Sequence, residues 1–182
     1  MIDRQPVLEG DRLTLRPLLP EDWNALYAVA SDPQIWAGHP SYDRWQEPVF
    51  RQFFADAMVR GGALAIIDKV TGEIIGSSQF DEPELEAPGE IEIGWSFLAH
   101  RYWGKGYNAE FKRLMLAHAL EHYERAIFQV GEDNVISRKA MENIGGVLTD
   151  RTRTFERGGG VMVRHVVYEI TREGFAKSWG AC

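Results

Sequence analysis

The clearest chemistry in the chain lies in residues 97–108, FLAHRYWGKGYN, where a strand-like run passes through a glycine-containing turn into a helical stretch. Gly104 and Gly106 have no side chains, so an anionic ligand can approach the backbone closely. The N–H groups that follow are the unpaired donors of a helix start, and the helix dipole adds partial positive charge. Arg101 and Lys105 add two local cations. The segment therefore predicts a cradle for a pyrophosphate group.

Two common phosphate motifs do not describe this turn. It lacks the third glycine of a dinucleotide-binding fingerprint, and no Gly-Lys-Ser/Thr follows four residues after a glycine, as a P-loop requires. Glycines between a strand and a helix can also serve backbone geometry alone. Phosphate binding and plain turn geometry both remain open on these residues.

The elements that must position the turn predict an α+β fold. Apolar and alternating runs indicate strands at residues 12–18, 63–69, 73–80, 90–98, 126–130, 147–155 and 161–170. Apolar spacing and end signals indicate helices at about 21–30, 45–59, 107–123 and 134–144. Turn residues at 70–72 and 157–160 indicate two hairpins. On the third helix, Tyr107, Phe111, Leu114 and His118 are expected to trace one face.

Composition limits the class of protein. A length of 182 residues suits a single domain, 1–182, and 45% hydrophobic with 26% charged residues excludes a disordered chain. The formal charge of −7 argues against nucleic acid as a partner, because the basic excess that neutralises phosphates is missing. We expect no membrane association and a cytoplasmic location, since neither a membrane-spanning run nor a signal peptide is apparent. The single cysteine, Cys182, excludes an internal disulfide and a thiolate zinc cluster.

In its motifs the chain resembles the GCN5-related N-acetyltransferases (GNAT). Residues 101–106, RYWGKG, match the fixed positions of that family's acetyl-CoA signature, Gln/Arg-x-x-Gly-x-Gly/Ala. Residues 134–146 resemble a second family element, Asn-x-x-Ser/Ala followed by a helix. The opening RLTLRPLLPEDW, residues 12–23, is similar to the branch that holds the ribosomal-protein alanine acetyltransferases. The resemblance covers a core at about 8–170. It implies a mixed, mostly antiparallel sheet of about six or seven strands, about four flanking helices and a cleft between two splayed parallel strands.

The resemblance implies that acetyl-CoA is the cosubstrate and that no metal takes part. In the family, a backbone N–H beside a bulge stabilises the oxyanion of the reaction intermediate. The resemblance places this N–H near Phe97 and implies that the pantetheine arm pairs with the backbone around Phe97 and Leu98. Asn134 offers a donor and an acceptor to the same arm. The residues expected to bind acetyl-CoA are Phe97, Leu98, Arg101, Tyr102, Trp103, Gly104, Lys105, Gly106, Tyr107, Asn108, Asn134 and Ser137.

The resemblance also implies direct attack of an amine on the thioester while both substrates are bound. An amine with a pKa of about 10 is protonated at neutral pH and needs a base. Glu92 is our candidate base, because strand alternation places Glu90, Glu92, Gly94 and Ser96 on one face. The alternative is that Glu90 and Glu92 are solvated strand residues. Both interpretations remain open on the sequence.

Two departures from the family concern the leaving thiolate. Met141 stands where many relatives carry the tyrosine that protonates it, and Gly146 replaces a closing phenylalanine. Ser137 is our second catalytic candidate, donating a proton through water, although it is equally interpretable as a helix cap. The same departures support an alternative function, a non-catalytic acetyl-CoA-binding module of the same fold.

The acceptor is expected to be a primary amine, either a small molecule or a protein N-terminus. We expect its pocket near Trp36, His39 and Tyr42, although aromatic residues clustered in this way also serve packing. An exposed hairpin edge makes a homodimer possible. A remoter alternative is a zinc hydrolase, since His118, Glu121 and His122 fit the H-x-x-E-H pattern.

Overall fold

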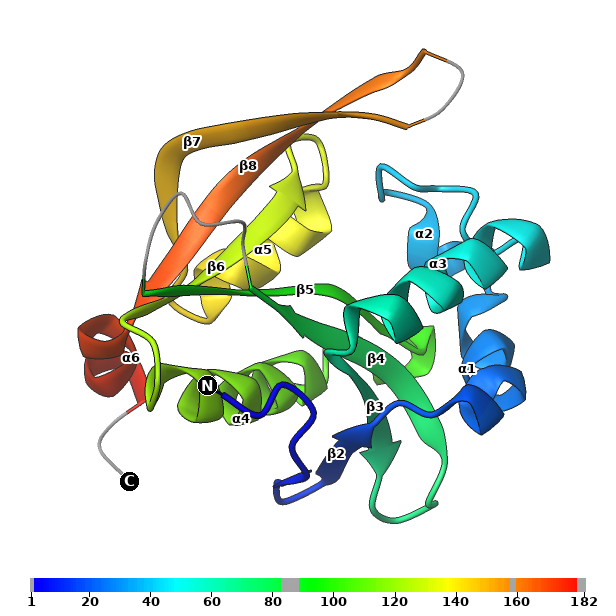
Figure 1. Ribbon diagram of the computed structural model, residues 1–182, viewed down its shortest axis with the longest axis horizontal. Helices are drawn as coiled ribbons and strands as arrows, with labels where there is room; N and C mark the ends of the chain where they lie inside the picture. The colour runs from blue at the N-terminus through cyan, green and yellow to red at the C-terminus, as the bar shows by residue number, and fades with distance from the viewer. Residues whose placement is uncertain (1, 83–88, 158–159, 180–182) are drawn as a thin grey trace.

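The computed structural model describes residues 2–82, 89–157 and 160–179, and its centre is one eight-stranded sheet (Figure 1). The strands are β1 (Leu8–Glu9), β2 (Leu13–Pro17), β3 (Ala63–Asp68), β4 (Ile74–Asp81), β5 (Glu90–Leu98), β6 (Arg125–Gly131), β7 (Val147–Glu156) and β8 (Met162–Thr171). Their order in the sheet is β1-β2-β3-β4-β5-β6-β8-β7. Every neighbouring pair is antiparallel except β5 and β6, which run parallel. The expected mixed, mostly antiparallel α+β fold is confirmed.

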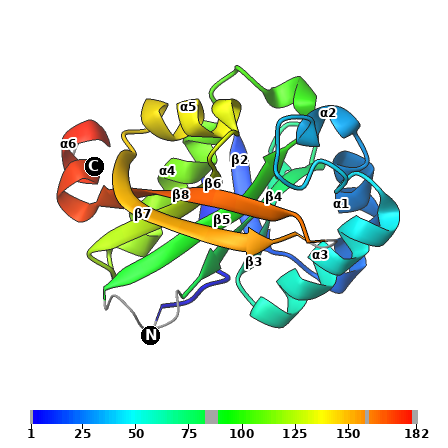
Figure 2. The ribbon, with the colours of Figure 1, turned by 90° about the horizontal axis from the view of Figure 1, so that it is seen from above.

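The helices lie on both faces of this sheet. They are α1 (Trp23–Ala30), α2 (Pro33–Trp36), α3 (Glu47–Arg60), α4 (Tyr107–Leu120), α5 (Val135–Asn143) and α6 (Arg172–Trp179), with single 3-10 turns at Pro20–Asp22 and His100–Tyr102. Figures 1 and 2 show α1, α2 and α3 gathered at one side of the molecule. The buried residues of these three helices form one core cluster, and those of α4 form another. The sheet therefore has two separate apolar interfaces.

Three elements were not expected from the sequence: β1, α2 and α6. For α2 the reason is local. Asp32-Pro33 ends α1, as expected, but the Asp32 carboxylate also accepts a hydrogen bond from the Gln34 N–H, and Pro33 occupies the first helical position. The same dipeptide therefore ends one helix and begins the next. With these additions, the described residues hold more strands and helices than expected.

The buried face of α4 differs from the predicted one. The fully buried side chains are Phe111, Lys112, Met115, Leu116, Ala119 and Leu120. Of the face that we expected, Phe111 is buried, while Tyr107, Leu114 and His118 are partly buried; Tyr107 and Leu114 still pack against the same core cluster, so the predicted face lies at the edge of the buried stripe. The spacing of apolar residues alone could not predict this buried face of α4, because the face includes Lys112.

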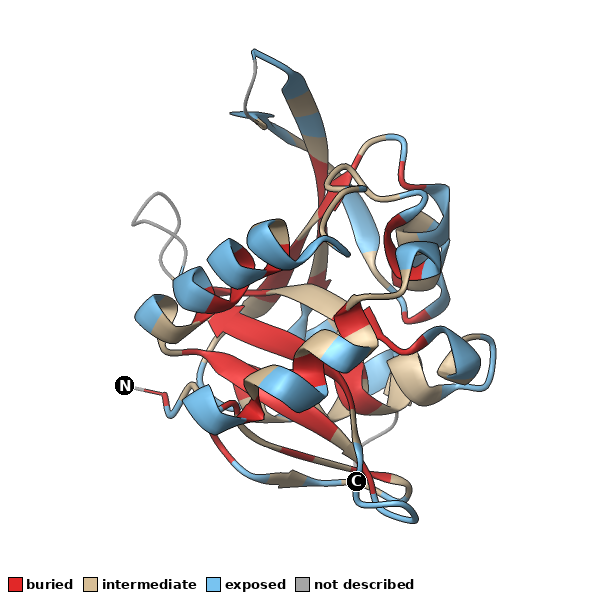
Figure 3. Ribbon diagram, turned by 90° about the vertical axis from the view of Figure 1, so that its right-hand side faces the viewer, coloured by how far each residue is buried: buried red, intermediate tan, exposed pale blue. Residues whose placement is uncertain are grey.

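The β7–β8 hairpin projects from the body of the molecule, and Figure 3 shows that its outer half is largely exposed while the central strands are buried. Of the expected turn at 157–160, Gly158 and Gly159 lie outside the described residues, as does Cys182. Among the residues that are described, no helix is long and apolar enough to cross a membrane.

Candidate active site

The site is organised by a gap between the two parallel strands. β5 and β6 pair at only three positions, Glu90 with Arg125, Ile91 with Ala126 and Glu92 with Ile127. Beyond Glu92 the strands have no further paired residues, so the polar backbone edges there are available to a ligand. This is the expected cleft between splayed parallel strands.

A bulge in β5 produces the change of direction. Between the pairs Ser77–Phe97 and Gln79–Gly94, β4 has one residue where β5 has two, Trp95 and Ser96. Trp95 has a φ of 53°, a left-handed conformation that is strained for a bulky residue. The strain is located next to the gap, where strained backbone residues tend to serve a function.

The bulge corrects our assignment of side chains to faces. Trp95 joins Glu92 and Gly94 around one cavity, whereas Ser96 lies on the opposite face and accepts a hydrogen bond from Lys112 of α4. Regular alternation had placed Ser96 with Glu92, and that prediction was wrong. One extra residue turns every later side chain to the other face.

The turn before α4 has the conformation that its glycines predict. Gly104 and Gly106 have φ values of 71° and 83°, both in the left-handed region. Gly106 is the N-cap of α4, and it supplies no side chain to the first N–H groups of the helix. The turn is held from outside, because Trp103 Nε1 donates to the Leu98 carbonyl at 3.0 Å and Arg12 donates to the Lys105 carbonyl at 3.0 Å. The free donors of α4 are thus presented on a fixed loop.

A cavity of about 420 Å³, called here the turn cavity, runs from this loop into the gap. All the residues that we expected to bind acetyl-CoA line it except Arg101, Lys105 and Tyr107. Arg101 is exposed and pairs with Glu73 at 3.3 Å, and Lys105 Nζ donates to the Arg101 carbonyl at 2.7 Å. Both cations thus lie on the outside of the loop, next to the cavity.

Asn134 and Ser137 both line the turn cavity, and of these two candidates for the helix cap the structure selects Asn134. Asn134 is the N-cap of α5, and its Oδ1 accepts a hydrogen bond from the Ser137 N–H at 3.3 Å. Ser137 lies inside the helix. The interpretation of Ser137 as a cap was wrong, and its hydroxyl is not needed for capping.

A second cavity of about 330 Å³, called here the Glu92 cavity, lies between β5, β6, the β7–β8 hairpin and the loop from α2 to α3. Glu92 is 8% exposed, and Gln129 Nε2 donates to its Oε2 at 3.3 Å. Gly94 keeps the carboxylate uncovered, since an added Cβ there would lie 3.7 Å from Glu92 Oε1. Glu92 is therefore a buried acid that faces a cavity.

The pKa of Glu92 is raised from 4.5 to about 7, chiefly by burial and also by the nearby Asp81 carboxylate, while Arg153, Arg60 and the hydrogen bond from Gln129 oppose the rise. A carboxyl group with a pKa near neutrality can accept a proton in one step and release it in the next. Such a pKa, in a cavity, is typical of a general base.

His39 lines both cavities, which are therefore adjacent at this residue. Trp36 faces the turn cavity and is 2% exposed, with its Nε1 donating to the Ala30 carbonyl. Tyr42 is 59% exposed and lies under the Arg157 guanidinium instead of lining either cavity. Of the three residues expected at the acceptor, the structure therefore places only His39 in the Glu92 cavity.

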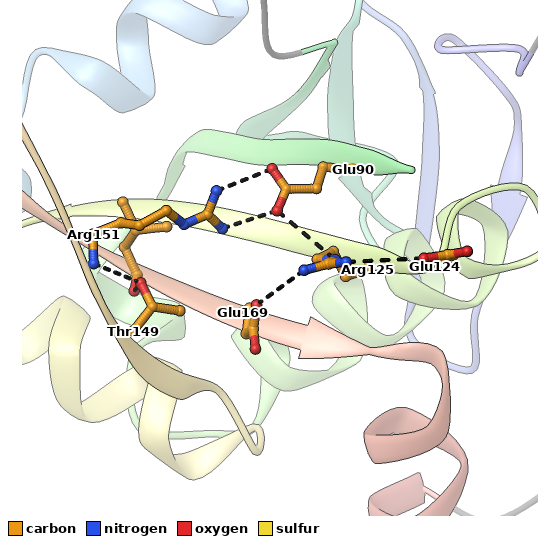
Figure 4. A network of polar contacts seen from close by, with 7 residues as sticks. Glu90, Glu124, Arg125, Thr149, Arg151 and Glu169 are labelled. Atoms are coloured by element: carbon orange, nitrogen blue, oxygen red, sulfur yellow. Dashed lines mark hydrogen bonds and ion pairs between the residues drawn. The ribbon is translucent and has the colours of Figure 1, made fainter. Parts of the chain in front are cut away.

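Glu90 is neither solvated nor close to the Glu92 cavity, so our alternative interpretation was wrong for this residue. It is 5% exposed, and both its oxygens accept from Arg151 of β7, at 3.1 and 2.9 Å. Figure 4 shows Arg125 of β6 on its other side, 3.8 Å away and also near Glu124 and Glu169. This network joins β5, β6 and β7 at the closed end of the gap.

Lys112 is a titratable residue that our sequence analysis missed. It is 5% exposed, hydrogen-bonds Ser96 Oγ, and lies over the rings of Phe111 and Phe128. Ser96 Oγ in turn lies 2.8 Å from Ser78 Oγ. The Lys112 amine therefore hydrogen-bonds a residue of the bulge, Ser96. Burial lowers the pKa of Lys112 from 10.5 to about 7.

We expect Lys112→Met to stabilise the protein at pH 7 and to flatten the pH dependence of its stability. Because the folded state has the lower pKa, the unfolded state binds more protons between about pH 7 and 10.5. The wild-type free energy of unfolding should therefore rise with pH across that window, by on the order of 4 kcal/mol. Urea denaturation of both proteins at pH 7 and pH 9.5 measures this. An equal difference between them at both pH values would contradict it.

Comparison with known proteins identifies the family. Residues 12–147 match the family model described as an acetyltransferase (GNAT) domain, so the chain belongs to the GNAT family. It is 27% identical over 176 residues to a Bacillus licheniformis protein called uncharacterized N-acetyltransferase p20, covering 93% of this chain and 98% of that protein.

Solved structures agree with this family. The acetyltransferase from Agrobacterium tumefaciens str. C58 is 27% identical, with a TM-score of 0.64 and coverage of 91% of this chain and 94% of that one. The microcin C7 self-immunity acetyltransferase MccE, solved with acetyl-CoA and AMP, shares the fold at 18% identity and a TM-score of 0.71, over 89% of this chain and 93% of its own.

Proposed function

We propose that this chain transfers the acetyl group of acetyl-CoA to a primary amine, by direct attack while both substrates are bound. One observation carries the proposal: His39 lines both the turn cavity and the Glu92 cavity, so the places proposed for the two ligands are adjacent at this residue. Family membership supports acetyl transfer, and the related fold of MccE was solved with acetyl-CoA.

The residues around the turn cavity fit acetyl-CoA. The uncapped start of α4 and the two glycines of its turn suit a pyrophosphate, and the unpaired edge of β5 at Phe97 and Leu98 suits an extended arm with amide groups. Arg101 and Lys105 would add positive charge at the rim. The bound molecule supplies an activated acyl group as a thioester.

Glu92 is proposed to take the proton from the attacking amine. At pH 7 about half of the Glu92 side chains are ionised, since their pKa is about 7. A backbone N–H near Phe97, beside the bulge, would stabilise negative charge that develops on the carbonyl oxygen. Both groups come from β5, so one strand supplies the base and the oxyanion donor.

Met141 stands at the position where many relatives carry the tyrosine that protonates the leaving thiolate. The Met141 side chain is 4% exposed and belongs to the apolar core. Ser137, which lines the turn cavity, stays our candidate for delivering a proton through water. A thiol of pKa about 8.5 is a fair leaving group even unaided, so the missing tyrosine is compatible with turnover.

The zinc hydrolase is disfavoured. His118 and His122 have ring centroids 6.0 Å apart, and His118 Nε2 lies 2.7 Å from the Asp3 carbonyl. In the described part of the chain, no group of three or more His, Cys, Asp or Glu side chains could hold a metal ion. The cytoplasmic location and the homodimer stay predictions.

The test combines calorimetry with acetyl-CoA and detection of free thiol across amino acids, polyamines, small amines and peptides with free N-termini. We expect binding of acetyl-CoA and amine-dependent release of CoA. Binding without release for every amine would favour the non-catalytic module, and absence of binding would overturn both.

A further inference from the structure

The Glu92 cavity is lined by more basic than acidic side chains. Its basic residues are His39, Arg44, Arg157 and His165, and its acidic residues are Glu92 and Glu156. Glu156 is exposed, and Glu92 is the proposed base. The two arginines are unexpected in a pocket whose proposed substrate is only an ammonium ion, because cations repel it.

Arg157 and Arg44 differ in how their charge is balanced. Arg157 pairs with Asp43 at 2.8 Å and lies over the ring of Tyr42. Arg44 lies over the rings of Trp36 and Phe53 and donates one hydrogen bond, at 3.0 Å, to Ser41 Oγ. Within the described residues, no carboxylate forms an ion pair with Arg44.

The two histidines act as neutral groups at pH 7. His39 Nδ1 accepts from the Ser41 N–H at 2.9 Å, which leaves its Nε2 as the donor, and burial beside Arg44 lowers the pKa of His39 to about 3. Burial and Arg44 also lower the pKa of His165. The His165 Nδ1 is buried without a hydrogen-bond partner among the described residues. Of the two arginines that line the cavity, Arg44 is thus the one without an ion pair among the described residues, and the two histidines beside it are neutral.

We propose that the acceptor is a small amine that also carries a carboxylate, as a free amino acid does, with its amine at Glu92 and its carboxylate at Arg44. The inference rests on the proposed function and narrows it. A planar guanidinium with a free edge suits a carboxylate, which can accept two parallel hydrogen bonds. A single net charge balances a carboxylate better than a doubly charged phosphate. An unmodified protein N-terminus has no carboxylate beside its amine.

Matched pairs of substrates test how much the carboxylate of the acceptor contributes to the rate. The proteinogenic L-amino acids are compared with their amides, with polyamines and with an aminoalkyl phosphate, using CoA release to obtain kcat/KM. Amidation removes the negative charge and lowers the pKa of the amine, so a larger fraction of the amide is unprotonated at neutral pH, which by itself favours the amide as acceptor. We therefore expect at least one amino acid to exceed its amide by about 10- to 100-fold, a preference that amine basicity cannot produce.

Variants of Arg44 test whether this residue causes the preference for an amino acid over its amide. Arg44→Met keeps an apolar stem against Trp36 and Phe53, and should reduce the ratio of amino acid to amide at least about tenfold while the KM for acetyl-CoA is unchanged. Arg44→Lys keeps the charge without the planar edge and should give an intermediate ratio. If Arg44→Met does not fold, the ratio of amino acid to amide in Arg44→Lys still tests the inference.

Equal rates for amino acids and amides, an equal ratio in the Arg44 variants, or preference for the aminoalkyl phosphate would overturn the inference while leaving acetyl transfer intact. If no amine is acetylated, the binding of amino acids tests the inference instead. Amino acids added to the CoA-saturated protein should then raise its melting temperature in the wild type and not in Arg44→Met. No shift in the wild type would also overturn the inference.

Discussion

Replacing Glu92 by glutamine is expected to lower kcat for amine acetylation by about a hundredfold or more, with the Kd for acetyl-CoA unchanged. Glutamine keeps the shape of the side chain and its contact with Gln129 but cannot accept the amine's proton. Stopped assays of CoA release at saturating amine measure kcat, and calorimetry measures Kd. A wild-type kcat in Glu92→Gln would remove the assigned base and leave the rest of the site.

The pH profile gives an independent check. Because the free protein has a Glu92 pKa of about 7, wild-type kcat/KM should rise with pH through that value as the carboxylate loses its proton. Glu92→Gln should lack this rise. It should also be more stable than wild type above pH 7, by on the order of 3 kcal/mol, since an ionised buried carboxylate is removed, so lost activity cannot reflect unfolding.

Glu121→Gln is the matched control for the same chemical change. Glu121 is exposed at the end of α4 and lines neither cavity, so this variant should keep wild-type kcat. The control also tests the remaining alternative, because a zinc hydrolase of the H-x-x-E-H type would lose its activity with Glu121. Equal losses in Glu92→Gln and Glu121→Gln would show that neither is the base.

Gly104→Val should abolish measurable binding of acetyl-CoA while the protein still folds. A Cβ added at Gly104 would meet no protein atom within 4 Å apart from its chain neighbours, so the chain itself leaves that space open beside the turn cavity. A side chain there would occupy the place proposed for the pyrophosphate. Calorimetry with acetyl-CoA is the measurement.

Gly72→Val separates ligand exclusion from backbone strain. Gly72 has the same φ, 71°, and the same open surroundings, but it lies in the β3–β4 hairpin. Both substitutions should cost about 1–2 kcal/mol of stability, because valine is strained at positive φ. Only Gly104→Val should lose acetyl-CoA. Similar affinity in the two variants would contradict the cradle.

The parts of the site that the sequence predicted are local. The turn at Gly104 and Gly106 is set by consecutive residues, whose conformational limits can be derived without knowing the fold. The strands and main helices follow from apolar spacing, as confirmed for β5, whose bounds agree. Predictions of this kind depend only on neighbours along the chain.

The Glu92 cavity could not be predicted in the same way. Arg44 comes from the loop after α2, and His165 from β8, so only the folded sheet brings them together. Lys112 was missed for a different reason. A charged residue on a helix is normally assigned to the surface, and only tertiary packing against Ser96 and two aromatic rings overrides that.

The bulge at Trp95 has a consequence for how this enzyme could change over evolutionary time. Deleting that single codon would restore two-residue periodicity while every other side chain of β5 kept its side of the sheet, Glu92 included. The shortened strand would lose a strained residue and could pair with β6 beyond Glu92, which would close the route proposed for the thioester. The shortened protein would be more stable but would have a lower turnover, so Trp95 should be retained wherever catalysis is under selection.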